Sequence, residues 1–498
     1  MANTLLNSLK QTANVKRTEN GAVSLKSTMD GVMDLFALGA AYRSRSDEDV
    51  ILLFEKALRE DPTYALKCLF YIRDCRGGQG ERRFFRVVTR WLARSHTDAM
   101  RRNLQYIPLF GRWDDLYVFV GTPLEKDASS IIKHQLALDV ECKTPSLLAK
   151  WLKSENTSSL ESRRLATITR RHLMMTSREY RKTLSVLRER IKVLERLMSQ
   201  NRWDEIEFDK IPSKAGLIYR NVFAKNDYTK ARYEKFAKDT TTKVNAGTLN
   251  PCDVVAKALQ ESWRGGLEST SRLMVNKYWD NLTDYFHNAV FDGVAVVDTS
   301  GSMTWGSSGN IMPIHVAIAL GMYCAEKCNP KSPWYGHYIT FSRQARLVPI
   351  EGVDFVDKVH RIEAANLCEN TNIESVFDLL LKQAIYNHIP NSEMPKNVII
   401  ISDMEFDAAR SDWNRPATPI NTLMEGIMKN WKAHGYTAPH LVFWNVNARN
   451  DNIPMRDNGN VTFVSGYSAT LFESLMTGKT GWDLIKEKLD SERYACIH

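Results

Sequence analysis

The sequence predicts a multidomain protein in which an all-α helical part is followed by an α/β part with a doubly wound, mostly parallel sheet. Apolar residues recur at helical spacing from about Met29 to Tyr285, whereas short β-rich runs alternate with helical patterns after Phe291. The net charge also changes sign between the two parts. With 498 residues, 43% of them hydrophobic and 25% charged, the chain is typical of globular proteins of several domains.

The N-terminal part begins with a polar segment. Residues 1–30 are rich in Asn, Thr, Ser and Lys with weak periodicity, so we expect a flexible N-terminal arm. Residues 31–288 contain many short amphipathic segments, broken by turns such as Asp61-Pro62 and Ile211-Pro212-Ser213. Successive amphipathic helices over such a length are typical of helical-repeat proteins, and we expect this domain to be one.

Residues 289–482 are expected to form the α/β domain. The predicted strands are the β-rich runs Gly293–Asp298, His337–Phe341, Val398–Asp403, His440–Asn445 and Val461–Val464. Helical patterns lie between them at about 311–328, 373–387 and 420–432. In doubly wound sheets, ligands bind beyond the carboxyl ends of the strands. Residues 483–498 contain a last helical pattern, which we expect to pack back on the helical domain.

No targeting signal is evident. The chain has no run of about 18 apolar residues that would span a membrane. Its first residues lack the apolar core of a signal peptide. The eight cysteines have no framework spacing, which favours reduced thiols. We therefore expect a cytoplasmic protein without membrane partners.

A possible cation site follows the first predicted strand, in Asp298-Thr299-Ser300-Gly301-Ser302. The carboxylate of Asp298 and the hydroxyls of Ser300 and Ser302 form an oxygen-only half-shell, which suits Mg²⁺ or Mn²⁺. Thr371 precedes a predicted helix and Asp403 ends another predicted strand, so both can complete the set. Such residues are also ordinary helix caps and turn residues. That alternative requires three separate segments to mimic the set.

The basic charge is concentrated in one window. Residues 1–290 carry a net charge of +14 and residues 291–498 a net charge of −5, and residues 163–202 alone hold twelve Lys and Arg against three acids. Such a stripe attracts RNA phosphates, although a merely solvated helix face is the alternative. The candidate RNA-binding residues are Arg163, Arg164, Arg170, Arg171, Arg178, Arg181, Lys182, Arg188 and Lys192.

Four further stretches carry a family resemblance: Arg73–Arg82 (RDCRGGQGER), Ile107–Leu116 (IPLFGRWDDL), Glu179–Leu184 (EYRKTL) and Ile211–Ala215 (IPSKA). With the D-x-S-x-S motif, the chain from about Thr18 onward resembles a viral, plant and fungal family related to the TROVE module of the Ro autoantigen. The resemblance implies a ring of HEAT-like helices closed by a von Willebrand factor A domain. Ro proteins bind small structured RNAs on the outside of this ring and pass RNA ends through its hole.

The resemblance also implies roles for the cation-site residues. Asp298, Ser300 and Ser302 would ligate the metal directly, Thr371 directly or through water, and Asp403 through water, as in a metal-ion-dependent adhesion site. The open position would take an acidic group of a protein ligand. We expect a Ro-like ribonucleoprotein component that binds structured or single-stranded RNA. The alternative is a metal-dependent protein-interaction scaffold, for example a viral one, without specific RNA binding.

Neither interpretation requires catalysis. Ser300 does not lie in a G-x-S-x-G elbow, and the histidines are dispersed without the spacing of zinc enzymes. Asp298 and Asp403 could in principle hold Mg²⁺ for phosphoryl chemistry, but an adhesion site uses them without any reaction. We therefore expect no catalytic residues and a protein that is not an enzyme.

Overall fold

The structure is a computed structural model, and it divides the chain into two compact units. It describes residues 4–260, 269–305, 311–341, 344–364, 371–408 and 422–498. One unit, here called the α/β unit, comprises residues 1–68 and 249–491. The other, the helical unit, comprises residues 69–248 and 492–498. The predicted combination of a helical N-terminal half and a mostly parallel sheet in the C-terminal half is confirmed.

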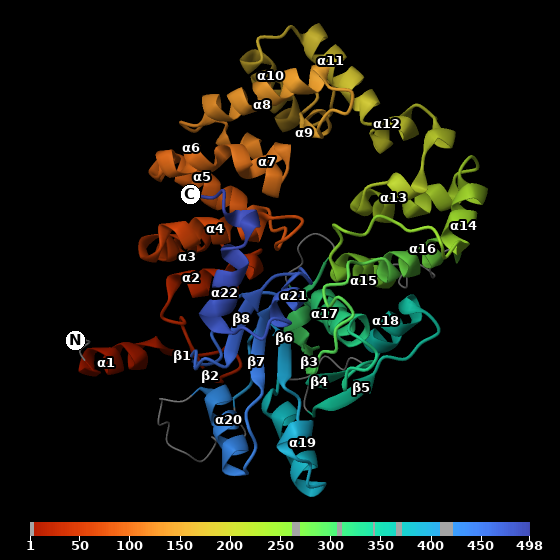
Figure 1. The fold of residues 1–498 in the computed structure, drawn as a ribbon. Coiled ribbons are helices and arrows are strands. Elements are labelled where there is room, and N and C mark those ends of the chain that lie inside the picture. Colours follow the sequence, from red (N-terminus) through yellow and green to blue (C-terminus); the bar gives the residue numbers. More distant parts are fainter. Residues whose placement is uncertain (1–3, 261–268, 306–310, 342–343, 365–370, 409–421) are drawn as a thin grey trace. The chain divides into compact units, whose positions relative to one another are not determined.

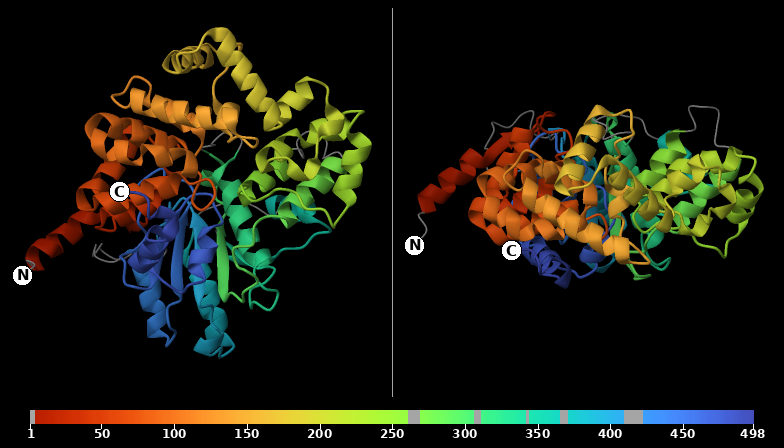
Figure 2. Two further views of the ribbon diagram at one scale, coloured as in Figure 1. Left: turned by 45° about the horizontal axis from the view of Figure 1, so that its top comes forward. Right: turned by 90° about the horizontal axis from the view of Figure 1, so that it is seen from above.

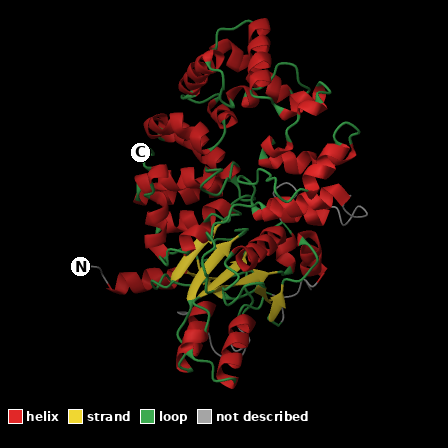
Figure 3. Cartoon of the chain, turned by 45° about the vertical axis from the view of Figure 1, so that its right-hand side comes forward, coloured by secondary structure: helices red, strands yellow, loops and turns green. Residues whose placement is uncertain are grey.

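The α/β unit is built on one six-stranded sheet with the strand order β5-β4-β3-β6-β7-β8 (Figures 1 and 3). All neighbouring strands are parallel except β4 and β5, which are antiparallel. Five strands of this sheet lie where the sequence predicted them, and its edge strand β5 was missed. The strands are β3 (Gly293–Asp298), β4 (His337–Phe341), β5 (Arg346–Pro349), β6 (Asn397–Ser402), β7 (His440–Asn445) and β8 (Val461–Ser465).

The two central strands place the cation-site motif at the carboxyl edge of the sheet. Every residue of β3 is buried, and five of the six in β6 are buried, as expected of Val- and Ile-rich strands covered on both faces. Helix α17 (Pro313–Lys327) packs against β3 through Gly321, where a Cβ atom would lie 2.4 Å from Val297 Cγ2. This close approach requires glycine, and it holds the strand that ends at Asp298.

Helices flank this sheet. The predicted helices near 311–328, 373–387 and 420–432 correspond to α17, α19 and α20, and the predicted start of the third at Ile420 lies outside the described residues. Besides α17, the described helices of this unit from residue 249 onward are α15 (Pro251–Gln260), α16 (Ser269–Asp280), α18 (Phe355–Ala364), α19 (Glu374–Tyr386), α20 (Leu423–Ala433), α21 (Leu471–Leu475) and α22 (Gly481–Leu489).

The N-terminal residues form part of the α/β unit, and the expected flexibility of residues 1–30 stays a prediction. Helix α1 (Thr4–Asn14) extends outward and is mostly exposed (Figure 2). Beyond it, β1 (Val15–Arg17) and β2 (Val23–Leu25) pair antiparallel, and Ala22 and Leu25 are buried. The weak periodicity concealed this hairpin because its strands have only three residues each.

The expected boundaries of the helical domain also differ from the two units. Helices α2 (Gly31–Leu38) and α3 (Asp47–Glu60) were expected in the helical domain but belong to the α/β unit, as do residues 249–288. All eight residues of α2 are buried, and α2 packs against β8. Apart from Asp34, the polar residue of α2, this helix is apolar, and a helix that is apolar on nearly every side belongs in a core, which explains why it covers the sheet.

The helical unit consists of short helices (Figure 1). Helix α4 (Pro62–Arg73) leads into it from the α/β unit. The remaining helices are α5 (Arg83–Ser95), α6 (Thr97–Asn103), α7 (Ile107–Phe110), α8 (Glu125–Glu141), α9 (Leu148–Trp151), α10 (Leu160–His172), α11 (Ser177–Arg190), α12 (Leu194–Ser199), α13 (Ser213–Lys225) and α14 (Lys230–Lys238). The expected ring concerns the relative placement of the units and stays a prediction.

The C-terminal segment is split between the units. Helix α22 packs against α2 and β8, and Trp482 Nε1 donates a hydrogen bond to Asp30 Oδ2. Residues 492–498 belong to the helical unit, where Arg493 pairs with Asp74. The expected helix over 483–498 therefore ends at Leu489. No helix among the described residues is long and apolar enough to cross a membrane.

Candidate metal centre and nucleic-acid interface

Asp298, Ser300 and Ser302 converge at the end of β3. Asp298 is fully buried, and its Oδ1 accepts a hydrogen bond from the Ser300 amide at 2.9 Å. Its Oδ2 accepts one from the Ser402 hydroxyl at 2.6 Å, which links the ends of β3 and β6. The hydroxyl oxygens of Ser300 and Ser302 are 3.0 Å apart. The motif therefore gathers a carboxylate and two hydroxyls in one turn.

Asp403 and Thr371 lie in the segments that adjoin this turn. Asp403 follows β6 directly and is fully buried. The charge of Asp298 and a hydrogen bond with Ser302 both act on the Asp403 carboxyl, so the three are neighbours. Thr371 is buried, and its carbonyl accepts a hydrogen bond from the Asp407 amide at 2.9 Å. Asp407 in turn acts electrostatically on Asp298. Thr371 is thus linked to the other four residues through the segment after β6.

The electrostatics of this cluster suit a divalent cation. Burial raises the pKa of Asp298, and burial together with the Asp298 charge raises the pKa of Asp403. Two adjacent buried carboxylates repel each other when both are ionised, and a cation removes that repulsion. Asp403 Oδ2 is buried and accepts no hydrogen bond within the described segments. A carboxylate oxygen that accepts no hydrogen bond, near the Ser302 hydroxyl and a second carboxylate, belongs to the kind of oxygen donor set that Mg²⁺ or Mn²⁺ prefers.

Three residues around this cluster were missed by the sequence analysis. Arg449, in the loop after β7, has Nη2 3.2 Å from Asp403 Oδ2 and Nη1 3.0 Å from Glu19 Oε2. Asn20 Nδ2 lies 3.4 Å from Thr371 Oγ1 and donates a hydrogen bond to the Glu405 carbonyl at 2.6 Å. The only local signal was the polar composition of the Glu19-Asn20-Gly21 turn and of residues 445–452, which is common in loops.

The candidate RNA-binding residues fall into two groups, of which the first is engaged in internal contacts. Arg170 pairs with Glu155 at 2.9 Å, and Arg188 donates hydrogen bonds to the carbonyls of Ala149 and Leu152. Arg188 therefore caps the end of α9. Three more basic residues of this group have partners. They are Arg164 with Glu161, Lys192 with Glu207, and Arg181 with the Ser177 carbonyl.

The second group is available to solvent. Its four side chains are exposed and form no ion pair or side-chain hydrogen bond with any residue in the described ranges. These residues are Arg163, Arg171, Arg178 and Lys182. Arg163 and Arg171 lie on α10, and Arg178 and Lys182 lie on α11. The basic surface of this window is therefore smaller than its composition suggested, because ion pairing and helix capping occupy the other members.

The family stretches Arg73–Arg82 and Ile107–Leu116 are joined by an ion-pair network within the helical unit. Asp115 is fully buried and accepts hydrogen bonds from Arg73 Nε at 2.9 Å and Arg86 Nε at 2.7 Å. At Gly111 a Cβ atom would lie 2.4 Å from Asp115 Oδ2, so the GRWDDL stretch needs its glycine. Arg73 thus pairs with a residue 42 positions away in sequence. These stretches therefore have a structural role.

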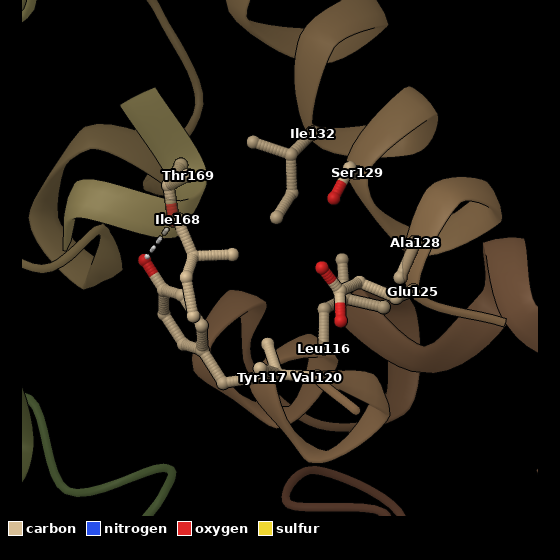
Figure 4. Close-up of a pocket in the computed structure, with 9 residues that line it drawn as sticks. All are labelled: Leu116, Tyr117, Val120, Glu125, Ala128, Ser129, Ile132, Ile168 and Thr169. Carbon is tan, nitrogen blue, oxygen red and sulfur yellow. Dashed lines mark hydrogen bonds between the residues drawn. The ribbon is translucent and has the colours of Figure 1, made fainter. Parts of the chain in front are cut away.

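A small cavity in the helical unit does not offer a binding site (Figure 4). It lies between η3 (Trp113–Phe119), α8 and α10, and it is lined mainly by apolar side chains. The Thr169 hydroxyl donates a hydrogen bond to Tyr117 Oη at 3.2 Å beside it. Its volume of about 10 Å³ holds at most one water molecule.

Comparisons with known proteins give family matches and similar proteins. The family model described as "Domain of unknown function (DUF2828)" matches residues 18–144 and 135–289, and the one described as "Domain of unknown function (DUF7788)" matches residues 292–494. "Uncharacterized protein L728" of Acanthamoeba polyphaga mimivirus is 29% identical over 515 residues, covering 94% of this chain and 85% of that protein. The assignment to the TROVE and von Willebrand factor A families stays a prediction.

Solved structures are matched as well. The crystal structure of the RO (RSR) protein of Deinococcus radiodurans matches with 13% sequence identity and a TM-score of 0.42. The match covers 93% of this chain and 94% of that chain.

Proposed function

This chain belongs to the family described as "Domain of unknown function (DUF2828)", and we propose that its α/β unit is a binding module that captures an acidic group through a divalent cation. One observation carries the proposal. Two buried carboxylates and the hydroxyls of the D-x-S-x-S turn meet at the carboxyl edge of the sheet, with an Asp403 oxygen that accepts no hydrogen bond in the described part of the chain.

The roles of the residues follow from their chemistry. Asp298, Ser300 and Ser302 would hold Mg²⁺ or Mn²⁺, with Thr371 and Asp403 completing the oxygen set. A bound cation supplies positive charge for a carboxylate ligand. The protein's own groups orient the ligands, since Ser402 fixes Asp298 and the Asp298 carboxylate in turn fixes the Ser300 amide. The proposal assigns binding to this site and no reaction.

The first test is the loss of the cation. Replacing Asp298 by asparagine keeps the size of the side chain but removes the charge that faces the cation. We expect the Mn²⁺ affinity, measured by electron paramagnetic resonance on the full chain, to fall. Replacing an outer-shell residue typically lowers metal affinity by about 10- to 100-fold, and the loss at Asp298 should be larger. Asp378→Asn, the same change at a surface ion pair of the α/β unit, is the control. Equal Mn²⁺ binding by Asp298→Asn and wild type would refute the site.

The acidic ligand can be tested with acetate, the simplest carboxylate. In Mn²⁺-loaded protein, acetate should lower the water-proton relaxation rate, because a carboxylate replaces a metal-bound water. Acetamide, which has the same shape without the charge, should leave that rate nearly unchanged. Equal effects of acetate and acetamide would contradict capture of an acidic group.

RNA binding by the helical unit is the second candidate function, and the four exposed basic residues on α10 and α11 favour it. Changing Arg163, Arg171, Arg178 and Lys182 to Glu should weaken binding of a stem-loop RNA. It should also reduce the slope of log affinity against log salt by about 0.7 to 0.9 for each phosphate that the variant no longer neutralises. Arg170 and Arg188 are left intact, because their interactions support the fold.

The control for RNA binding makes the same charge change in the α/β unit, at Lys382, Lys396, Lys429 and Lys432, which are all exposed. Filter binding across a salt series distinguishes the two sets. If both sets reduce affinity equally, binding follows net charge alone and the α10–α11 surface has no special role.

A further inference from the structure

The N-terminal hairpin, defined here as residues 15–25, is joined to the loop that follows β6. The Thr18 hydroxyl donates a hydrogen bond to the Phe406 carbonyl at 2.7 Å, and the Ala408 amide donates to the Asn20 carbonyl at 3.0 Å. The Glu19 amide donates to Glu405 Oε2 at 2.8 Å. The segment directly after Asp403 is therefore held by residues that lie almost 400 positions earlier in the chain.

The same hairpin is joined to the loop that follows β7. Leu25 and Ile453 exchange both backbone hydrogen bonds, at 2.9 and 3.0 Å. The side chain of Asn450 donates to both Glu19 Oε1 at 2.9 Å and Glu405 Oε1 at 2.8 Å. The hairpin thus connects the two loops that carry Asp403 and Arg449.

Arg449 lies between two carboxylates that differ in their exposure to solvent. Its guanidinium contacts Asp403, which is fully buried, and Glu19, whose side chain is 51% exposed. The contact between Arg449 Nη2 and Asp403 Oδ2 has ion-pair distance without hydrogen-bond geometry, since Asp403 Oδ2 has no hydrogen-bond partner among the residues described. Arg449 therefore neutralises Asp403 by charge while leaving the lone pairs of that oxygen unfilled.

We propose that Arg449 is a resident counter-ion of the cation site, and that Glu19 of the N-terminal hairpin controls how strongly Arg449 holds Asp403. This inference rests on the proposed function, because it concerns the affinity of that site for its cation. A guanidinium and a divalent cation compete for the same buried carboxylate, and their mutual repulsion is poorly screened there. Glu19 draws the guanidinium away from Asp403 and so favours the cation.

Each variant, made in the full chain, should change the Mn²⁺ affinity in a defined direction. Arg449→Met removes the competing charge and should tighten Mn²⁺ binding by about tenfold, within the range of measured coupling between sites. Glu19→Gln releases Arg449 toward Asp403 and should weaken Mn²⁺ binding by about fivefold. In the double variant, the Glu19 change should have no further effect. Arg449→Lys, which keeps the charge, should stay near wild type.

Arg456→Met is the matched control. Arg456 has the same 29% side-chain exposure as Arg449 and pairs with Glu425 at 2.8 Å in the same unit. Its loss should leave Mn²⁺ affinity unchanged, which separates a specific effect from the loss of any half-buried ion pair. Circular dichroism of each variant checks that the sheet is intact.

The experiment separates this inference from the proposed function. If wild type does not bind Mn²⁺, both are overturned. If wild type binds and Asp298→Asn does not, but Arg449→Met weakens binding, Arg449 has only a structural role and this inference alone fails. It also fails if Glu19→Gln weakens binding equally with and without Arg449, because Glu19 then acts directly on the cation. Tighter binding by Arg449→Met, together with a Glu19 effect that needs Arg449, supports it.

Discussion

Replacing Asp115 by alanine is expected to lower the free energy of unfolding of the helical unit by about 3–5 kcal/mol, the cost of breaking a buried ion pair from one side. The carboxylate of Asp115 is contacted by the guanidinium groups of Arg73 and Arg86 and by the Arg112 amide. Arg73 is only 3% exposed, so it would remain buried without its counter-charge.

The charge state of Asp115 agrees with this expectation. Burial alone would raise the pKa of its carboxyl, but the charges of Arg73 and Arg86 outweigh burial and hold the pKa below its ordinary value. Hydrogen exchange of the amides in α5 and α7, measured in the full chain, reports the stability of this region. Asp98→Ala, which removes an exposed pair with Arg101, should cost less than about 1 kcal/mol. Similar protection in both variants would contradict a structural role for the network.

Acid is expected to destabilise the α/β unit between about pH 6.5 and pH 4, through His315 and His440. Burial lowers the pKa of each imidazole from 6.5 to about 4. The folded state therefore favours neutral histidine. The resulting stabilisation is fully present above the pKa of the histidine in the unfolded state, and it is lost as the pH falls through the pKa in the folded state. For a fully buried imidazole the loss is on the order of 3 kcal/mol; it should be smaller for the partly buried His440.

The structure gives a reason for the neutral form at His315. The Nδ1 atom accepts a hydrogen bond from the Met312 amide at 3.3 Å, at the N-terminus of α17, where a positive charge is also opposed by the helix dipole. His315→Asn keeps an acceptor there but cannot be protonated, so its thermal unfolding temperature should fall less between about pH 6.5 and 4 than that of wild type. His434→Asn, a change at an exposed histidine, should follow wild type. Equal pH dependence in all three proteins would refute the expectation.

Local patterns in the sequence were sufficient for the strands and for the order of the two architectures. The runs that became β3 and β6 are apolar throughout because both faces of a parallel sheet are buried, and this signal needs no information from distant residues. The edge strand β5 was missed because it is short and mostly exposed, so it lacks such a signal. The three-residue strands of the N-terminal hairpin were missed for the same reason of length.

The candidate cation site was predictable only in part. Asp298, Ser300 and Ser302 are adjacent in sequence, and Asp403 ends a recognisable strand, so their chemistry could be inferred from local order. Glu19 and Arg449 could not be found in this way. Their relation to Asp403 depends on loops from opposite ends of the chain, and each is an ordinary loop residue in its own segment.

The sequence by itself determined the fold class and the oxygen-rich turn, because burial of a strand on two faces and the spacing of the oxygen ligands both produce patterns that are recognisable within a few residues. Only the tertiary structure decided which charges are available. Arg188 caps a helix, Arg73 neutralises Asp115, and Arg163 faces solvent, although all three are arginines in basic segments. A charge is available for a ligand only if the fold leaves it without a partner, and ion-pair partners are selected by proximity in space, which sequence separation does not reveal.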